Sequence, residues 1–451
     1  MSTTTSSVFE EPNTMFEGST KSIRSELDLT SIPGTDVSTL FYGDYSQYYP
    51  QISTRENYNP LEFRITPDSA GYLDLADSFL LIKCKIVHSD GKPCDENDIV
   101  SPGVLFLHSM FSNIELYVNN KLVKDSSNFY PYEAYIRKHL STSPEEKQNG
   151  LLNEFYYPNS VPDNFSNDPS SGDPGFKKRF SLTQNSKSFT MLGRLDVNLF
   201  LQNRYLPSET LLTISLRRSP PQFCLNAAYE TKFGYVGCPY IYQIIQAVLF
   251  IRRKIISPAI INEHRKDLAS GKTLKYPMMD TEITTYSIGK GITSNIQENV
   301  LMGRIPKILV IGFVSSSALD GALTKSPFNF QNFNLCEINV STNIQSMQYN
   351  TIPLDFSEND FLLALQTLQK TASDPTLGNG ITRDNFTLGN NLLAFEIFPI
   401  VGNTLSMNKM GSIRISVKFK EPLPENINVI VYSQYQTLLE IDGNRNVHIE
   451  Q

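Results

Sequence analysis

The sequence predicts an all-β protein made of two tandem β-sandwiches behind a flexible N-terminal arm. Three observations support this fold class: many short segments with strand patterns, few helical segments between them, and features that recur about 218 residues apart. Hydrophobic residues make up 40% of the 451 residues, which provides for packed cores and excludes a wholly disordered chain. The length alone suggests two to four domains.

Residues 1–54 differ in composition from the rest and are expected to form the arm. Sixteen of the first forty residues are Ser or Thr, and the segment carries two basic and seven acidic side chains. It has no sustained apolar periodicity, so it is expected to be disordered alone or ordered only against a partner. The Tyr-rich run Phe41–Tyr49 is a candidate anchor for its end. A solvated tail and a specific docking arm both fit this composition.

Strands are expected along most of the chain from Leu61 onward. Residues 413–419 alternate apolar and polar side chains, the pattern of a strand with one buried face. Asn119 and Asn120 tolerate the left-handed backbone and predict a tight hairpin turn. The expected strands are Phe79–Val87, Ile114–Val118, Leu211–Leu216, Ile241–Ile251, Thr281–Ile288, Ile308–Val314, Leu335–Val340, Leu392–Phe398, Ile413–Phe419 and Ile427–Tyr432.

Three short helices are expected between the strands. Ser143 and Pro144 give the start signal of the first, which Gly150 ends. Ser257 and Pro258 open the second, which Gly271 ends. The third covers about 357–370, where leucines recur at helical spacing.

Four features occur in the same order in both halves of the chain and predict an internal duplication. The paired segments are Ile114–Val118 with Cys336–Val340, the helix-like Tyr132–Leu140 with Asp360–Lys370, Gly193–Leu199 with Gly411–Val417, and Leu206–Pro207 with Leu423–Pro424. The predicted division is an arm at 1–54, a first sandwich at 55–256, a connecting helix at 257–271 and a second sandwich at 272–451.

Three apparent ligand motifs are better explained as turns. Ser270–Thr273 ends like a phosphate-binding loop but follows a helix, so a helix end is expected there. Gly289–Gly291 has Ser294 where a dinucleotide fingerprint needs glycine. Asp442–Asn446 has the first calcium-loop positions but Val447 where glycine is required, and is expected to be a hairpin turn.

Histidine and cysteine placement gives no local signal of catalysis or metal binding. The sequence has no two histidines one residue apart, as a two-domain cupin enzyme would need, no Cys-x-x-Cys and no Gly-x-Ser-x-Gly. No enzyme activity, catalytic residue, cofactor or metal ligand is therefore predicted. The odd number of cysteines predicts reduced thiols. The histidines are His88, His108, His139, His264 and His448, and the cysteines are Cys84, Cys94, Cys224, Cys238 and Cys336.

Charge patterning argues against a chain that coats nucleic acid. The formal net charge is −7, whereas neutralising phosphate needs clustered Lys and Arg. Three basic clusters, Lys177–Arg179, Arg217–Arg218 and Arg252–Arg253–Lys254, are interpreted as solvated sheet ends or intersubunit salt bridges. No apolar run is long enough for a membrane span, and no secretory signal is expected at the N-terminus.

Two similar sandwiches, low charge and no active site suggest a structural building block. Three copies would place six sandwiches around a three-fold axis, a nearly hexagonal unit that can tile a surface. Residues 55–451 resemble the double jelly-roll major capsid proteins of Polinton (Maverick) elements and adintoviruses, in the adenovirus hexon lineage. The segments that carry the resemblance include Ser112–Asn119, Asn203–Pro207, Phe250–Lys254, Thr324–Phe330, Asn426–Tyr432 and Glu440–Val447.

The resemblance implies two jelly rolls and a homotrimeric, pseudo-hexameric capsomer of an icosahedral shell around double-stranded DNA. The implied partners are other copies of the chain and penton or minor capsid proteins, without sequence-specific nucleic-acid binding. The implied location is the virion capsid, with synthesis in the host cytoplasm and assembly in the host nucleus. A minor or spike jelly-roll protein, a tandem β-sandwich that binds carbohydrate or another ligand, and a two-domain cupin enzyme are the alternatives.

Overall fold

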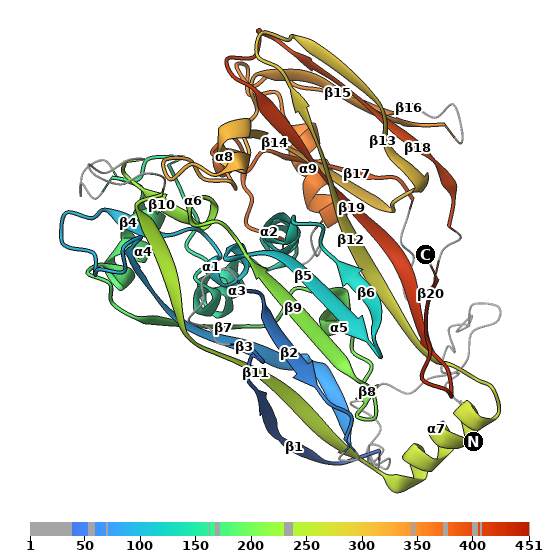
Figure 1. Ribbon diagram of the computed structural model, residues 1–451. Helices are drawn as coiled ribbons and strands as arrows, with labels where there is room; N and C mark the ends of the chain where they lie inside the picture. Colours follow the sequence, from blue (N-terminus) through green and yellow to red (C-terminus); the bar gives the residue numbers. More distant parts are fainter. Residues whose placement is uncertain are drawn as a thin grey trace, which may run out of the picture.

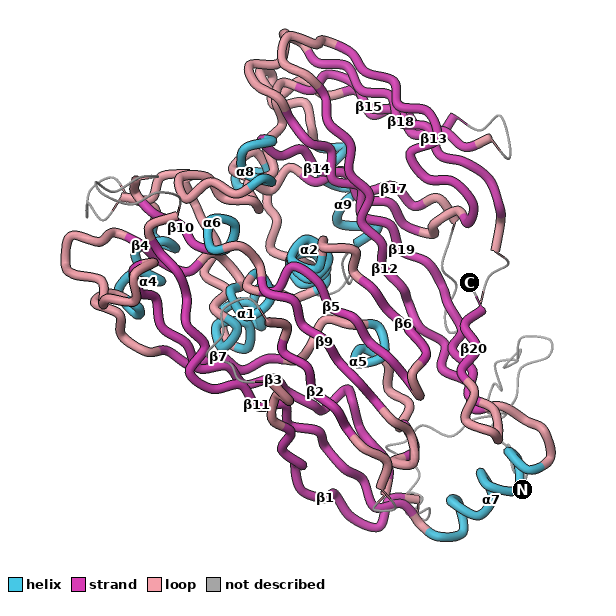
Figure 2. The backbone as a smooth tube through the Cα atoms, viewed as in Figure 1, coloured by secondary structure: helices cyan, strands magenta, loops and turns pink. Residues whose placement is uncertain are grey.

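The computed structural model describes residues 38–52, 59–68, 71–161, 163–166, 172–229, 238–343, 348–372, 378–398, 405 and 408–450. Within these residues the chain forms two β-sandwiches that lie side by side, with short helices around and between them (Figure 1). Figure 2 shows the same arrangement, with strands dominating both lobes. The all-β class and the two tandem sandwiches predicted from the sequence are confirmed.

The first sandwich packs a five-stranded sheet against a four-stranded sheet. The larger sheet has the order β1 (Thr39–Tyr48), β11 (Tyr240–Ile256), β3 (Tyr72–His88) and β7 (Phe189–Gly193), with β8 (Leu206–Pro207) also on β3. The smaller has the order β2 (Leu61–Ile65), β9 (Leu212–Arg218), β5 (Phe111–Val118) and β6 (Lys121–Asp125). A separate pair joins β4 (Val100–Pro102) to β10 (Leu225–Ala227).

The second sandwich repeats this arrangement. One sheet has the order β12 (Leu274–Ile288), β19 (Ile427–Ile441), β14 (Ile308–Ser315) and β17 (Leu392–Glu396), with β20 (Val447–Glu450) on β19. The other has the order β13 (Ser294–Arg304), β18 (Met410–Phe419), β15 (Leu335–Thr342) and β16 (Gln348–Pro353).

The strand order shows that both sandwiches are jelly rolls of the same topology. When β4, β8, β10 and β20 are set aside, the remaining strands of each sandwich pair in the order first, eighth, third, sixth in one sheet and second, seventh, fourth, fifth in the other. All the strand pairs within these sheets are antiparallel. The predicted duplication is therefore present in the topology.

Short helices fill the connections between strands. The pair α2 and α9 occupies the same place in each sandwich, between the fifth and sixth strands, as the sequence repeat predicted. The described helices are α1 (Phe106–Ser109), α2 (Tyr130–Ser141), α3 (Pro144–Gln148), the 3₁₀ turn η2 (Gly150–Glu154), α4 (Pro174–Thr183), α5 (Asn198–Leu201), α6 (Pro221–Cys224), α7 (Pro258–Ala269), α8 (Ser316–Asp320), α9 (Leu362–Ala372) and α10 (Arg383–Phe386).

Local sequence signals account for several of these elements. Ile413, Ile415 and Val417 are buried on one face of β18, as the alternation predicted. Asn119 and Asn120 both have positive φ and join β5 to β6 in a two-residue hairpin.

Two markers of the repeat were wrongly aligned: Gly193–Leu199 with Gly411–Val417, and Leu206–Pro207, which precedes β9, with Leu423–Pro424, which follows β18. Residues 194–197 leave the sheet after β7 and run into α5, whereas the partner segment lies in strand β18. The topological equivalent of β18 is β9. Leu195 and Val197 are buried although they lie outside any strand. Because every second residue of this connection is buried, its sequence alternates like that of a strand, and the two could not be told apart by pattern.

Two further expectations need correction. The boundary of the arm at residue 54 is too late, because Thr39–Tyr48 forms β1 and pairs with β11. Residues 1–37 lie outside the described part of the chain. The helix expected from 357 begins only at Leu362, because the backbones of Asp355 and Asp360 pair with each other just before it.

The basic cluster at 177–179 is not simply a solvated sheet end. Arg179 lies in α4 and is fully buried, where its guanidinium donates to the carbonyl oxygens of Pro102 and Tyr157 and to Asn159 Oδ1. This buried guanidinium ties α4 to β4 and to residues 157–159.

Candidate functional site

Helix α2 lies between the two sandwiches and forms the centre of the seam that joins them (Figure 1). Tyr132 is fully buried and donates its hydroxyl proton to the carbonyl oxygen of Pro327 at 3.0 Å. The ring of Tyr135 stacks on Phe328 with 4.3 Å between centroids. Pro327 and Phe328 belong to the second sandwich, so one helix of the first lobe supplies both contacts. Aromatic pairs of this kind add specific packing to the buried area.

A buried ionic network crosses the same seam. Lys124 on β6 donates to Glu133 Oε1 on α2 at 2.7 Å, to Asp280 Oδ1 on β12 at 3.2 Å and to the carbonyl oxygen of Thr281. Arg137, one turn along α2, donates to Asp196 Oδ1 at 2.7 Å and to the Thr281 hydroxyl. The network therefore links a strand and a helix of the first sandwich to a strand of the second.

Burial sets the electrostatics of this network. The pKa of Glu133 is raised because burial opposes its charged form more strongly than Lys124 and Arg137 favour it. Burial acts to lower the pKa of Lys124, but Glu133 and Asp280 outweigh it, so that the pKa is raised and the ammonium stays charged. A charged group held this far from water depends on its partners, so each member of the network constrains where the others lie.

The lower end of the seam is closed by α7 and the C-terminal hairpin. The Tyr72 hydroxyl lies 2.8 Å from His264 Nδ1 on α7. Glu209 pairs with Arg265 of α7 at 3.0 Å and with Arg445 of the loop between β19 and β20. The seam is therefore held at its centre by α2 and at its lower end by α7 and the loop between β19 and β20.

A second buried cluster lies inside the first sandwich, beneath α2. His108 Nε2 lies 3.0 Å from Glu154 Oε2, and Lys138 Nζ lies 2.7 Å from the same oxygen. Burial would raise the pKa of Glu154, but its bonds to His108 and Lys138 lower it to about 2. Burial lowers the pKa of His108, whose Nδ1 is 2.6 Å from the Tyr130 hydroxyl. A neutral imidazole that donates through Nε2 and accepts from Tyr130 satisfies both contacts.

Replacing Glu154 with glutamine is expected to flatten the acid limb of the stability curve. The pKa of Glu154 is about 2 in the folded chain and near 4.5 when unfolded, so its contribution is complete above about pH 4.5 and is lost as the pH falls towards 2. That difference corresponds to about 3 kcal/mol. Urea unfolding between pH 2 and 7 would measure it. The exposed Glu145→Gln should leave the curve unchanged, and equal curves for all three proteins would contradict the assignment.

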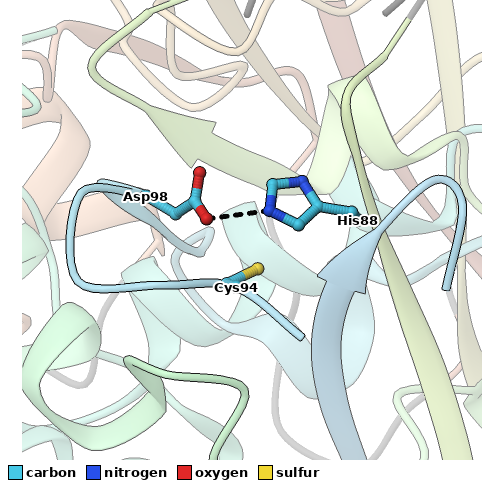
Figure 3. Close-up of side chains that lie close together, drawn as sticks. All are labelled: His88, Cys94 and Asp98. Atoms are coloured by element: carbon cyan, nitrogen blue, oxygen red, sulfur yellow. Dashed lines mark hydrogen bonds and ion pairs between the residues drawn. The ribbon is translucent and has the colours of Figure 1, made fainter. Parts of the chain in front are cut away.

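A third cluster brings together His88, Cys94 and Asp98, one potential metal ligand from each (Figure 3). His88 Nε2 lies 2.8 Å from Asp98 Oδ2, and all the donor atoms lie within 4.8 Å of one another. His88 is the last residue of β3, and the other two lie in the loop that leads to β4. This is the one such group among the described residues, and all three side chains are buried.

This cluster was not predicted from the sequence. Its spacing, six residues and then four, matches none of the paired-histidine and paired-cysteine motifs that are typical of metal sites. The sequence does carry one indication of the cluster: three residues of types that bind metals follow one another closely at the end of a strand and in the turn after it. The other four histidines lie apart from it: His108, His139 and His264 are in helices, and His448 is on β20.

Within the described residues, none of the helices has both the length and the apolar composition needed to cross a membrane.

Comparisons with known proteins point to one fold. A chain in the cryo-EM structure of the Sputnik virophage superposes with a TM-score of 0.62 at 12% identity, covering 96% of this chain and 93% of that chain. The mavirus major capsid protein gives a TM-score of 0.55 at 9% identity, covering 98% and 97%. The PBCV-1 virus capsid gives 0.56 at 9% identity, covering 94% and 99%.

At the sequence level, an uncharacterized protein of Caenorhabditis elegans is 22% identical over 408 residues, covering 86% of this chain and 92% of that protein. No protein-family model matches the chain. Each of these structural matches covers more than nine-tenths of both chains, so the likeness spans both sandwiches of this chain. This chain therefore has the double jelly-roll fold of viral major capsid proteins.

Proposed function

We propose that this chain is a major capsid protein that forms homotrimers. The observation that carries the proposal is the pair of sandwiches with identical strand order, fixed to each other by the buried seam. Three such units around a three-fold axis present six similar sandwiches, so a trimer has nearly hexagonal edges and can pack against six neighbours. This role requires a rigid seam, because the six sandwiches of a trimer keep nearly hexagonal positions only if the two lobes of each chain keep a fixed relative orientation.

The proposal extends to an icosahedral shell around a double-stranded DNA genome, in the Polinton and adintovirus lineage. The nematode relative of nearly full length supports that lineage, since an integrated element leaves its capsid gene in an animal genome. The net charge of −7 fits a shell that leaves genome neutralisation to other proteins. The further partners proposed are penton and minor capsid proteins. The proposed role is structural and not enzymatic, in the virion capsid, with synthesis in the host cytoplasm and assembly in the host nucleus.

The purified full-length chain is expected to be a trimer in solution. Light scattering after size exclusion should give three times 50.9 kDa, about 153 kDa, at all concentrations tested. Negative-stain electron microscopy should show particles with a hexagonal outline. A stable monomer of 50.9 kDa would contradict the proposal and favour a ligand-binding tandem sandwich.

Residues 1–37 are proposed to act between capsomers, while the two jelly rolls and the connecting helix form the capsomer itself. A variant lacking residues 1–37 retains β1, so it separates the two roles. It should remain a trimer but fail to form shells where the full-length chain assembles.

A further inference from the structure

We propose that His88, Cys94 and Asp98 bind one zinc ion. The ligand atoms are an imidazole nitrogen, a thiol sulfur and a carboxylate oxygen, all within 4.8 Å of one another. Zinc bonds of about 2.0–2.3 Å place tetrahedral ligand atoms roughly 3.3–3.8 Å apart, so an ion would replace the 2.8 Å hydrogen bond between His88 Nε2 and Asp98 Oδ2, and these two atoms would move apart by roughly 0.5–1 Å. Nitrogen, sulfur and carboxylate oxygen together favour zinc over the hard cations calcium and magnesium, which take oxygen ligands.

Neighbouring groups hold Asp98 and the backbone of Cys94 in position, as the outer shell of a metal site does. Asp98 Oδ1 accepts from the Tyr240 hydroxyl at 3.0 Å, and Asp98 Oδ2 accepts from the backbone N–H of Asp95 at 2.8 Å. The backbone N–H of Cys94 donates to Ser186 Oγ at 2.7 Å. These bonds come from three separate parts of the chain, so the carboxylate of Asp98 and the backbone at Cys94 are held in place before any ion arrives.

The position of the cluster is suited to a structural ion. His88 ends β3, and Cys94 and Asp98 lie in the loop that turns back towards β4, so one ion would tie the loop to the sheet. The three residues are 6%, 7% and 2% exposed. Binding releases the thiol proton of Cys94 to solvent, and the proton between His88 Nε2 and Asp98 transfers to His88 Nδ1, so that the imidazole binds zinc through Nε2 in its neutral form. A water molecule completes four ligands. The proposal does not depend on a capsid role, because the site lies wholly within one lobe.

The test is a cobalt and zinc titration of the full-length chain after chelation and dialysis. Cobalt should bind at one equivalent per chain, with the visible bands of a tetrahedral ion and a near-ultraviolet thiolate band, and zinc should displace it. Cys94→Ser should remove the thiolate band and weaken zinc binding at least tenfold. Asp98→Asn should weaken zinc binding by a similar factor without removing the thiolate band.

Cys336→Ser is the matched control, since Cys336 lies on β15 of the other sandwich and its thiol contacts the carbonyl oxygen of Lys418 at 3.2 Å. It should bind both metals like the unmodified chain. Circular dichroism would verify that each variant is folded. Two results would overturn the proposal: no cobalt bands in the unmodified chain, or unchanged zinc affinity in a folded Cys94→Ser variant.

Discussion

Replacing Lys124 with methionine is expected to lower the free energy of unfolding by about 3–5 kcal/mol, because it leaves Glu133 and Asp280 buried without their cation. Lys124 lies where β6, α2 and β12 meet, so the loss falls on the seam and not on one sandwich. Methionine keeps most of the aliphatic length and removes only the charge and the hydrogen bonds. Chemical denaturation followed by tyrosine fluorescence would measure the change.

Lys121→Met is the matched control, because Lys121 lies on the same strand with its side chain exposed and should change stability by less than about 0.5 kcal/mol. A triple variant, Lys124→Met with Glu133→Gln and Asp280→Asn, removes the charges together and should recover part of the loss. Equal stability of Lys124→Met and the unmodified chain would show that the buried ion pairs do not hold the seam.

Much of the fold was predictable because the signals that specify strands are local. A jelly-roll strand buries one face, so period-two alternation marks segments such as 413–419 directly in the sequence. The hairpin at Asn119–Asn120 depends on two adjacent residues with positive φ. Edge strands carry a weaker signal: β13 and β16 were not predicted, and several β13 side chains face solvent.

The contacts of the seam were not predictable, because the residues that form them are far apart in sequence. Lys124 and Asp280 are 156 residues apart, and Tyr132 and Pro327 are 195 apart. Nothing local distinguishes Lys124, which is buried, from Lys121 on the same strand, which is exposed. The lobes must be placed against each other before such pairs exist. A duplication visible in sequence therefore predicts two sandwiches but not the contacts that join them.

Replacing Tyr132 with alanine is expected to cost about 3–5 kcal/mol, since it removes a fully buried ring from the aromatic cluster at the seam. Tyr132→Phe keeps the ring and removes only the hydroxyl that donates to Pro327, so it should cost about 1 kcal/mol. Thermal unfolding monitored by circular dichroism would rank the two variants. A larger loss in Tyr132→Phe than in Tyr132→Ala would contradict the assigned roles.

A residue that holds the two sandwiches together can be distinguished from an ordinary core residue by where its replacement destabilises the protein. Phe63→Ala removes a fully buried ring from β2, within the first sandwich, and should cost a similar amount of stability. Hydrogen exchange should then differ: Tyr132→Ala should expose the amides of 328–330 in the second sandwich, whereas Phe63→Ala should leave them protected. If the capsomer needs lobes in a fixed arrangement, Tyr132→Ala should also reduce the trimer yield more than Phe63→Ala at equal stability. The same loss of free energy then has different consequences for assembly, because only one of the two residues holds the sandwiches together.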